Sequence, residues 1–439
     1  MSYRASRNIP AFAAAVLVAA AAPVPAWGEL AALYTSEDSG FFTFALHGGK
    51  MFGGTYGGGA SRVYRFDASE FVMEHVFPDA ESVFRLIGRA DGGGVLLANC
   101  ERNSTGAAPL FKRNDATNTW EDTGVGVVPE DARSMGLGGG FAGGRYWVGV
   151  IPYIPGETAR TDIWSSLDGL SFSRVQRLTD GAAKPFAEYW GSVYTGTLWT
   201  GSPAIHRFNG SSFERAADLP GWGDSADYAL EYKGALYISG SGIARFKGGA
   251  QVEVVLDPPS GDGFFQQLAK VRDPASGAEW LYACWSKGWR AGGGGAQLWR
   301  TSDGTGWSVY QTFPESECWA AATLTGGDLW VGTREDRGRG RVYHEEIFET
   351  GDAGFDAGSD AGNDDAGAHD AGGDAAVPED AHVGADHGPA KPDASISPDS
   401  DAKTSDSGGV ASDDSGNSGG RPAGGGEDSA GCSCAVIVL

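Results

Sequence analysis

The chain has 439 residues, with 57 acidic against 33 basic side chains and a formal net charge of −24. This acidic balance excludes the basic surface that nucleic-acid binding requires, so we expect no nucleic-acid partner. After one apolar run near the N-terminus, no stretch of about 20 apolar residues follows, which excludes a later membrane-spanning helix.

Residues 1–28 have the order of a secretory signal peptide. Arg4 and Arg7 precede the apolar run 11–22, and the segment 23–28 supplies small residues for cleavage. A basic start, a short apolar stretch and a small-residue site are the features of a Sec-type signal. A membrane anchor is the alternative, but it needs a longer apolar run. We therefore expect an exported protein, located outside the cell or on its surface or outer envelope.

Residues 29–350 contain internal repeats with a mean spacing of roughly 46 residues, within the range of β-propeller blades. Each repeat holds a strand in which aromatic or aliphatic residues alternate with small or polar ones. A single four-stranded sheet cannot bury both faces alone, so such sheets pack around an axis. We predict an all-β fold, a β-propeller of seven four-stranded blades, with six or eight blades as alternatives. The recurring strands begin at positions 50, 95, 146, 198, 236, 281 and 329.

An additional strand-like segment, residues 30–34, precedes the first repeat. The seventh repeat ends near Glu346 without a fourth strand of its own. A first strand that joins the last sheet would complete that sheet and tie the two ends of the domain together. We therefore expect residues 30–34 to pair beside the final strand of the last blade.

Turns within the repeats share a short acidic motif. The turns at Asp168 and Asp303 place Gly directly after Asp and an aromatic residue four positions after it, and weaker copies occur at Asp67, Asp115 and Asn209. These turns resemble the Asp-box, or BNR, repeat of sialidase-like propellers. The short side chain caps backbone N–H groups of its own turn, and Gly permits the tight reversal. The resemblance implies that these five residues are structural and lie opposite the ligand face.

The catalytic groups that a sialidase needs are not evident in the sequence. That chemistry requires arginines for a carboxylate, a Tyr–Glu pair and an acid. The segment 84–87, Phe-Arg-Leu-Ile, resembles the Phe-Arg-Ile-Pro motif of the family but lacks its Pro. No His is at metal-ligand spacing with another His. We therefore assign no catalytic residue, no cofactor and no metal.

The first functional hypothesis is a non-catalytic binding module, and a secreted glycoside hydrolase or lyase of sialidase-like fold is the alternative. A third is a structural envelope protein without a defined ligand. Aromatic and arginine side chains in Gly-rich loops can stack on a sugar or contact a protein. Local packing and solvated loop arginines are the alternatives to such a role. We expect a monomer that binds a glycan or protein at one rim. The candidate ligand residues are Tyr153, Trp222, Trp285, Trp289, Arg290, Trp319 and Arg334.

Three cysteines, Cys100, Cys284 and Cys318, fall within the repeats. Export into an oxidising compartment permits disulfides. We expect a disulfide between Cys284 and Cys318, which would join neighbouring blades. Buried free cysteines are the alternative.

Residues 351–431 differ sharply from the repeats. Asp, Gly, Ala and Ser make up 60 of these 81 residues, and acids outnumber bases by 18 to 3. Such a segment has too little apolar surface to offset its ordering entropy, and its like charges extend it. We predict a disordered spacer. Calcium binding by its aspartates is the alternative, but the ligand pattern of a calcium loop is missing.

The final segment, residues 432–439, contains Cys432 and Cys434 followed by five apolar residues. With the Asp-Ala-Gly repeats of the spacer, it resembles the C-terminal sorting tags of myxobacterial exported proteins, the MYXO-CTERM type. The resemblance implies anchoring at the membrane or cell surface through these two cysteines. The transmembrane stretch and basic end of that family are missing, so we expect an incomplete or truncated tag.

Overall fold

The fold is all-β, and the described part of the chain contains strands and turns but no helix. The structure is a computed structural model. It describes residues 30–347 except 68–69, 103–108, 128–131, 154–159, 201, 220, 223–224, 260–262, 288–293, 325 and 336–337. The expected signal segment, the spacer and the final segment with Cys432 and Cys434 lie outside the described residues. Within those residues, no helix has the length and apolarity that a membrane crossing requires.

The strands form antiparallel groups of four in which consecutive strands pair. The first half comprises β2 (Gly40–His47), β3 (Lys50–Tyr56), β4 (Ser61–Asp67) and β5 (Glu70–Phe77); β6 (Ala80–Ile87), β7 (Leu97–Arg102), β8 (Leu110–Asn114) and β9 (Thr119–Asp122); and β10 (Arg133–Ala142), β11 (Arg145–Tyr153), β12 (Thr161–Ser166) and β13 (Ser173–Leu178). Two further groups are β14 (Ala182–Tyr189), β15 (Ser192–Leu198), β16 (Ala204–Phe208) and β17 (Phe213–Asp218), and β18 (Ala226–Tyr232), β19 (Ala235–Gly240), β20 (Ile243–Phe246) and β21 (Val252–Leu256). The remaining strands are β22 (Phe264–Arg272), β23 (Glu279–Ser286), β24 (Gln297–Thr301) and β25 (Ser308–Thr312), then β26 (Glu317–Ala322), β27 (Asp328–Arg334) and β28 (Arg341–Glu346), which are joined by β1 (Ala31–Thr35).

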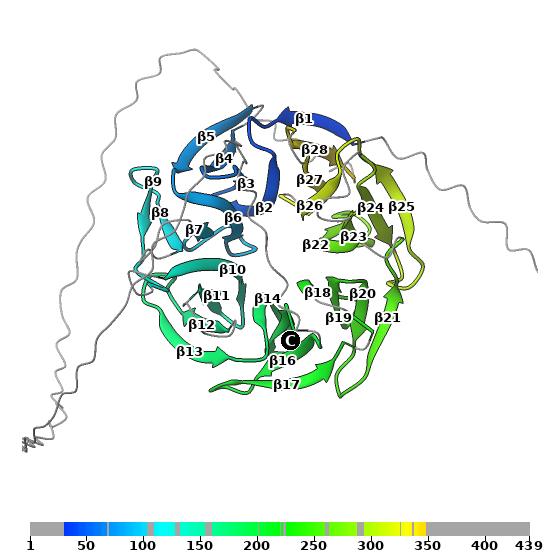
Figure 1. The fold of residues 1–439 in the computed structure, drawn as a ribbon. Coiled ribbons are helices and arrows are strands. Elements are labelled where there is room, and N and C mark those ends of the chain that lie inside the picture. Colours follow the sequence, from blue (N-terminus) through cyan, green and yellow to red (C-terminus); the bar gives the residue numbers. More distant parts are fainter. Residues whose placement is uncertain are drawn as a thin grey trace, which may run out of the picture. The chain divides into compact units, whose positions relative to one another are not determined.

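The groups lie side by side around a ring, with the first strand of each group innermost (Figure 1). Every innermost strand shifts register against its neighbour at the corresponding place, because it has one more residue there than its neighbour. These bulge residues are Phe42, Phe84, Leu137, Lys184, Pro185, Asp227, Gln266, Gln267 and Trp319.

The bulge residues contact one another across different groups. The rings of Trp319 and Phe42 stack with centroids 4.0 Å apart, and the Phe84 ring lies 5.5 Å from Phe42. Lys184 forms an ion pair with Asp227, and its Nζ lies 5.7 Å from the Trp319 ring. Side chains from five innermost strands therefore pack together in the middle of the ring.

Strand β1 joins the two ends of the described chain. It pairs antiparallel with β28, with Ala31 opposite His344, as the sequence led us to expect for residues 30–34. Just before it, Leu30 is buried, and its N–H donates to Gln311 Oε1 of β25 at 2.8 Å. The Tyr34 ring packs 5.1 Å from Phe71 of β5. This N-terminal segment thus contacts three groups: the last one and the groups on either side of it.

Three of the five motif residues cap their own turns. Asp168 accepts hydrogen bonds from the amides of Leu170 and Ser171, both at 2.8 Å. These amide donors and Ser166 hold the pKa of Asp168 well below its usual range. Asp303 and Asn209 accept two backbone amides each in the same way.

Asp115 was predicted as a weaker copy of the capping motif, but its side chain does not cap its own turn. Its carboxylate bonds to His47 Nε2 at 2.8 Å and to Arg113. The neighbouring Asn114 accepts the amide of Ala116 at 3.1 Å. The capping position is therefore one residue earlier than the motif suggested. The side chain of Asp67 lies outside the described residues.

Cys284 of β23 and Cys318 of β26 form a disulfide, which links two neighbouring groups. Cys100 is a buried free cysteine, and burial raises the pKa of its thiol. The chemistry of the described cysteines is therefore structural.

Candidate functional site

A recurring Gly-Thr pair sets the end of several second strands. The hydroxyls of Thr55, Thr197 and Thr333 each accept the N–H of a residue at the start of the following third strand, at 2.9–3.1 Å. Equivalent threonine hydroxyls therefore make the same hydrogen bond in three strand groups. The residues that follow these threonines, Tyr56, Leu198 and Arg334, are therefore equivalent and lie at one end of the ring.

Tyr56 and Glu81 form the first element of the candidate site. Tyr56, the last residue of β3, donates its phenol O–H to Glu81 Oε1 at 2.5 Å. Glu81 lies near the start of β6 in the next group, and a bridge between Tyr56 and Ser82 brings the two strands together. Burial and the hydrogen bond to Glu81 raise the pKa of the Tyr56 phenol.

Glu101, near the end of β7, adds a second carboxylate. Its Oε2 accepts a hydrogen bond from Ser82 Oγ at 3.4 Å. Burial and the nearby charge of Glu81 raise the pKa of Glu101 to about 7. Its protonation state therefore changes across the neutral range, which an ordinary glutamate does not do.

Arg334, the last residue of β27, lies beside this cluster. Its guanidinium carbon is 4.7 Å from the centre of the Tyr56 ring. Its Nη1 donates to Glu317 Oε1 at 2.7 Å, and the side chains are only 5% and 2% exposed. Arg334, which the sequence predicted as an exposed rim residue, is instead a buried, paired cation beside the Tyr56 ring.

The three described tryptophans among the predicted ligand residues are also buried, which is a second correction. Trp222, Trp285 and Trp319 are 6%, 4% and 6% exposed. For Trp222 and Trp285, the absence of a Cβ on a neighbouring glycine explains how the indole can be buried. A Cβ at Gly240 would lie 2.8 Å from the Trp222 ring, and one at Gly263 would lie 2.5 Å from Trp285 Nε1. Gly240 and Gly263, which are distant from these tryptophans in sequence, thus make room for the indoles to pack against the backbone.

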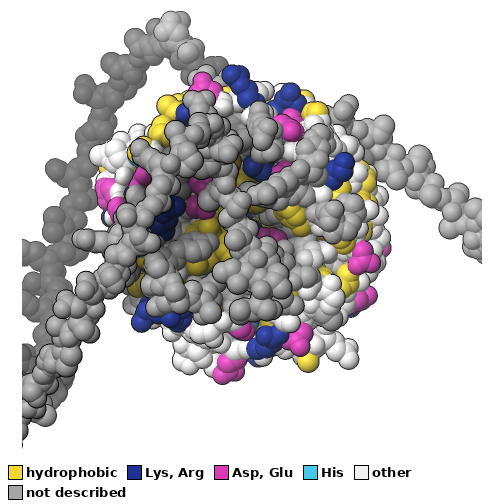
Figure 2. Space-filling view, viewed as in Figure 1, with side chains coloured by type: hydrophobic (Ala, Val, Ile, Leu, Met, Phe, Trp, Pro, Cys, Tyr) yellow, Lys and Arg dark blue, Asp and Glu magenta, His cyan; other side chains and the backbone are white. Residues whose placement is uncertain are grey.

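The remaining predicted ligand residues are Trp289, Arg290 and the side chain of Tyr153, and all three lie outside the described residues. In the view of Figure 2, hydrophobic and acidic side chains lie next to one another toward the middle of the ring. Of the predicted ligand residues that the structure describes, Arg334 alone belongs to the cluster that the structure brings together. The assembled cluster is Tyr56, Glu81, Glu101 and Arg334.

Sequence reasoning missed Tyr56, Glu81 and Glu101. Tyr56 and Glu81 are 25 positions apart and belong to different strand groups, so no local motif connects them. The usable signal was the Gly-Thr pair before Tyr56 and Arg334, which marks equivalent strand ends.

Among the described residues, one group of three side chains has donor atoms close enough to hold a metal ion. In Asp328, His344 and Glu346 these atoms lie within 4.8 Å of one another. Asp328 already accepts hydrogen bonds from Trp330 Nε1 at 2.6 Å and from the Leu324 amide at 2.8 Å. These bonds hold the carboxylate in its own turn, so we give the group a structural role.

Comparisons with known proteins find similar folds without a sequence relative. No family model matches the chain, and no curated protein matches it. The extracellular domain of the putative one-component system BT4673 from B. thetaiotaomicron is 13% identical with a TM-score of 0.49, over 72% of this chain and 40% of that one. U3-55K is 11% identical with a TM-score of 0.49, over 72% and 97% of the two chains. The Hadza microbial sialidase Hz136 is 11% identical with a TM-score of 0.42, over 66% and 73%.

Proposed function

We propose that this chain is an exported, surface-associated β-propeller that binds a neutral glycan without converting it. In this proposal the described strands make seven four-stranded blades, the last completed by β1, with single bridges between some neighbouring blades. The signal segment 1–28 exports the protein, and the final segment with Cys432 and Cys434 anchors it. It acts as a monomer, and its ligand binds at the end of the ring where β3, β7 and β27 terminate.

The cluster of Tyr56, Glu81 and Glu101 carries this proposal. Carboxylates offer several acceptor sites, and a sugar offers hydroxyl donors. The hydrogen bonds they form are charge-assisted and stronger than neutral ones. Side chains from separate blades meet here, which is the arrangement a ligand site at one end of a propeller requires.

The charge of the cluster favours a neutral over a carboxylated ligand. Two carboxylates, Glu81 and Glu101, are close enough for one to raise the pKa of the other. The nearby cation Arg334 is already paired with Glu317. The two carboxylates would therefore repel a ligand carboxylate. This argues against the sialidase reaction, which requires arginines for that group.

The Tyr56–Glu81 pair supports the second candidate, a secreted glycoside hydrolase or lyase. A hydroxyl hydrogen-bonded to a base is the arrangement of an activated nucleophile. The raised pKa of Tyr56 opposes this role, because it keeps the phenol protonated at neutral pH. If Tyr56→Phe abolishes turnover of a bound glycan while binding persists, the enzyme reading is correct and the binding-module proposal is wrong.

We expect affinity for a neutral glycan to rise between pH 6 and pH 8. The ionised Glu101 is the stronger acceptor, and its ionised fraction grows as pH passes its pKa of about 7. The gain should be roughly 10-fold, the value of one charge-assisted hydrogen bond. Isothermal titration with hits from an array of neutral and carboxylated oligosaccharides measures this dependence.

In that titration, Glu101→Gln should flatten the pH profile. The control is Glu231→Gln, which alters an exposed glutamate near the opposite end of β18 and should leave the profile unchanged. Binding confined to carboxylated glycans, or a wild-type pH profile in Glu101→Gln, would contradict the proposed site.

A further inference from the structure

Trp199 is an exposed indole on a strained backbone. It directly follows β15, its side chain is 42% exposed, and its φ is +59°. Bulky L-residues rarely adopt this left-handed conformation, which costs on the order of 1–3 kcal/mol and is concentrated at ligand sites. Glycine would fit the backbone without that cost, so the presence of Trp points to a role for the side chain.

Trp199 lies at the same end of the ring as the Tyr56 cluster. Thr197 is equivalent to Thr55 and Thr333, so Leu198 corresponds to Tyr56 and Arg334. Trp199 is one residue further along the chain. Of the described tryptophans, only Trp190 and Trp199 are exposed, and Trp190 lies in the turn at the other end of β15.

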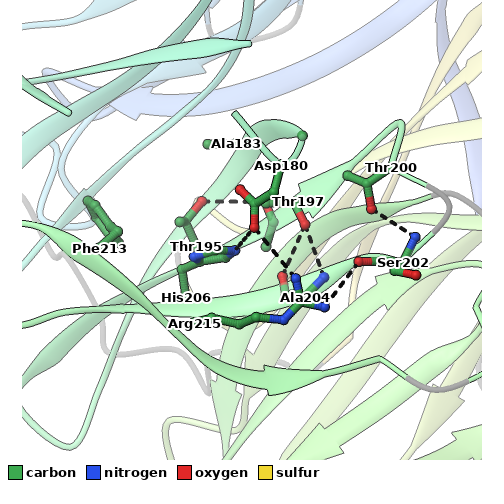
Figure 3. Close-up of polar contacts among 12 residues, drawn as sticks. Asp180, Ala183, Thr195, Thr197, Thr200, Ser202, Ala204, His206, Phe213 and Arg215 are labelled. Carbon is green, nitrogen blue, oxygen red and sulfur yellow. Dashed lines mark hydrogen bonds and ion pairs between the residues drawn. The ribbon is translucent and has the colours of Figure 1, made fainter. Parts of the chain in front are cut away.

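Hydrogen-bonding groups on the same blade surround the segment that follows Trp199, as the positions of Asp180, Thr200, Ser202 and Arg215 show (Figure 3). Asp180 lies 3.5 Å from Arg215 Nη1 and 3.3 Å from His206 Nε2. Arg215 also donates to the Ser202 carbonyl at 3.5 Å, and Thr200 Oγ1 accepts the Ser202 amide at 2.9 Å. Asp180 and Arg215 are 41% and 42% exposed, so both can reach a ligand.

The methyl group of Thr200 fills the space beside Gly181, where a Cβ would lie 2.1 Å from it. This contact joins the segment after β15 to the segment that carries Asp180. Thr200 directly follows Trp199 in the chain, so this contact brings the Trp199 position and the acid–base pair into one segment of the blade. We call Asp180, Trp199, Thr200, Ser202 and Arg215 the Trp199 surface.

We infer that the Trp199 surface is a stacking subsite for one hexopyranose ring of a neutral glycan; this rests on the proposed function. The apolar face of a pyranose stacks on an indole, while its hydroxyls bond to flanking polar groups. A protein partner would need a larger apolar patch. Apart from Trp190, which lies at the other end of β15, the remaining exposed large hydrophobic side chains in the described ranges, such as Leu167, Met73 and Val309, belong to other strand groups.

The test compares Trp199→Gly with Trp190→Gly. Both remove an exposed indole from a left-handed position, since Trp190 has a φ of +49° and is 68% exposed. Both variants should therefore fold, with unchanged or higher melting temperatures. The probes are gluco-, manno- and galacto-configured neutral oligosaccharides, titrated by calorimetry and by quenching of tryptophan fluorescence.

We expect Trp199→Gly to weaken binding at least 10-fold and Trp190→Gly to leave it unchanged. Trp199→Phe should restore part of the affinity, because a smaller ring still stacks. Wild-type affinity in Trp199→Gly, together with a Glu101-dependent pH profile, overturns this subsite and leaves the proposed function intact. If no neutral oligosaccharide binds the wild-type protein, both proposals are wrong.

Discussion

Removal of residues 30–35 will abolish cooperative folding of the ring. The truncated chain loses all pairing of β1 with β28 and the burial of Leu30, which is 3% exposed. It also exposes the edge of β28 to water and to other chains. The loss is on the order of 5 kcal/mol or more, comparable with the whole stability of many domains. Thermal and urea unfolding followed by circular dichroism measure it.

Two single substitutions within this segment keep the prediction testable if the truncated chain does not fold. Leu30→Ala should cost about 2–4 kcal/mol, because Leu30 packs in the core shared by β25 and β28. Leu33→Ala, at a leucine that is 40% exposed in the same strand, should cost about 0.5 kcal/mol or less. Equal effects of the two substitutions, or an unchanged melting temperature after truncation, would contradict the closing role of β1.

Arg334→Ala will destabilise the protein by about 3–5 kcal/mol. The substitution leaves the Glu317 carboxylate, which is 2% exposed, without its guanidinium partner. It also removes the cation beside the Tyr56 ring. The effect is large because a buried uncompensated charge costs more than the pair itself contributes. Equilibrium unfolding in urea gives the change directly.

The double variant Arg334→Met, Glu317→Met separates this cause from simple loss of packing. It should recover most of the lost stability, since two apolar side chains of similar size need no countercharge. As a surface comparison, Arg89→Ala breaks the exposed pair with Asp91 and should leave stability nearly unchanged. If the double variant is as unstable as Arg334→Ala, the uncompensated charge of Glu317 is not the cause of the destabilisation.

Elements with local signals could be predicted from the sequence, and contacts between blades could not. The period of the repeats located the strands, and residues 30–34 were recognisable as an extra strand. The caps at Asp168, Asp303 and Asn209 depend on residues within three positions, so a motif describes them. Tyr56 and Glu81 meet only because neighbouring blades pack, and no short-range pattern encodes that contact.

The tryptophans show why composition misled the site prediction. Trp222 and Trp285 stand among glycines, which are common in exposed loops. Other glycines, Gly240 and Gly263, lack a Cβ where the indoles pack, so the rings are buried. Conversely, Trp199 directly follows a regular strand, yet its backbone is left-handed and its side chain is exposed. Only the backbone conformation distinguishes these cases.

The most direct test of the closed ring is a disulfide between Ala31→Cys and His344→Cys. These residues are opposite each other in the register of β1 and β28, and a disulfide requires Cα atoms within about 7 Å. We predict a cross-linked peptide pair containing positions 31 and 344 in non-reducing mass spectrometry of the oxidised monomer. Two free thiols at these positions, or pairing of position 31 with any other cysteine, would contradict closure by β1.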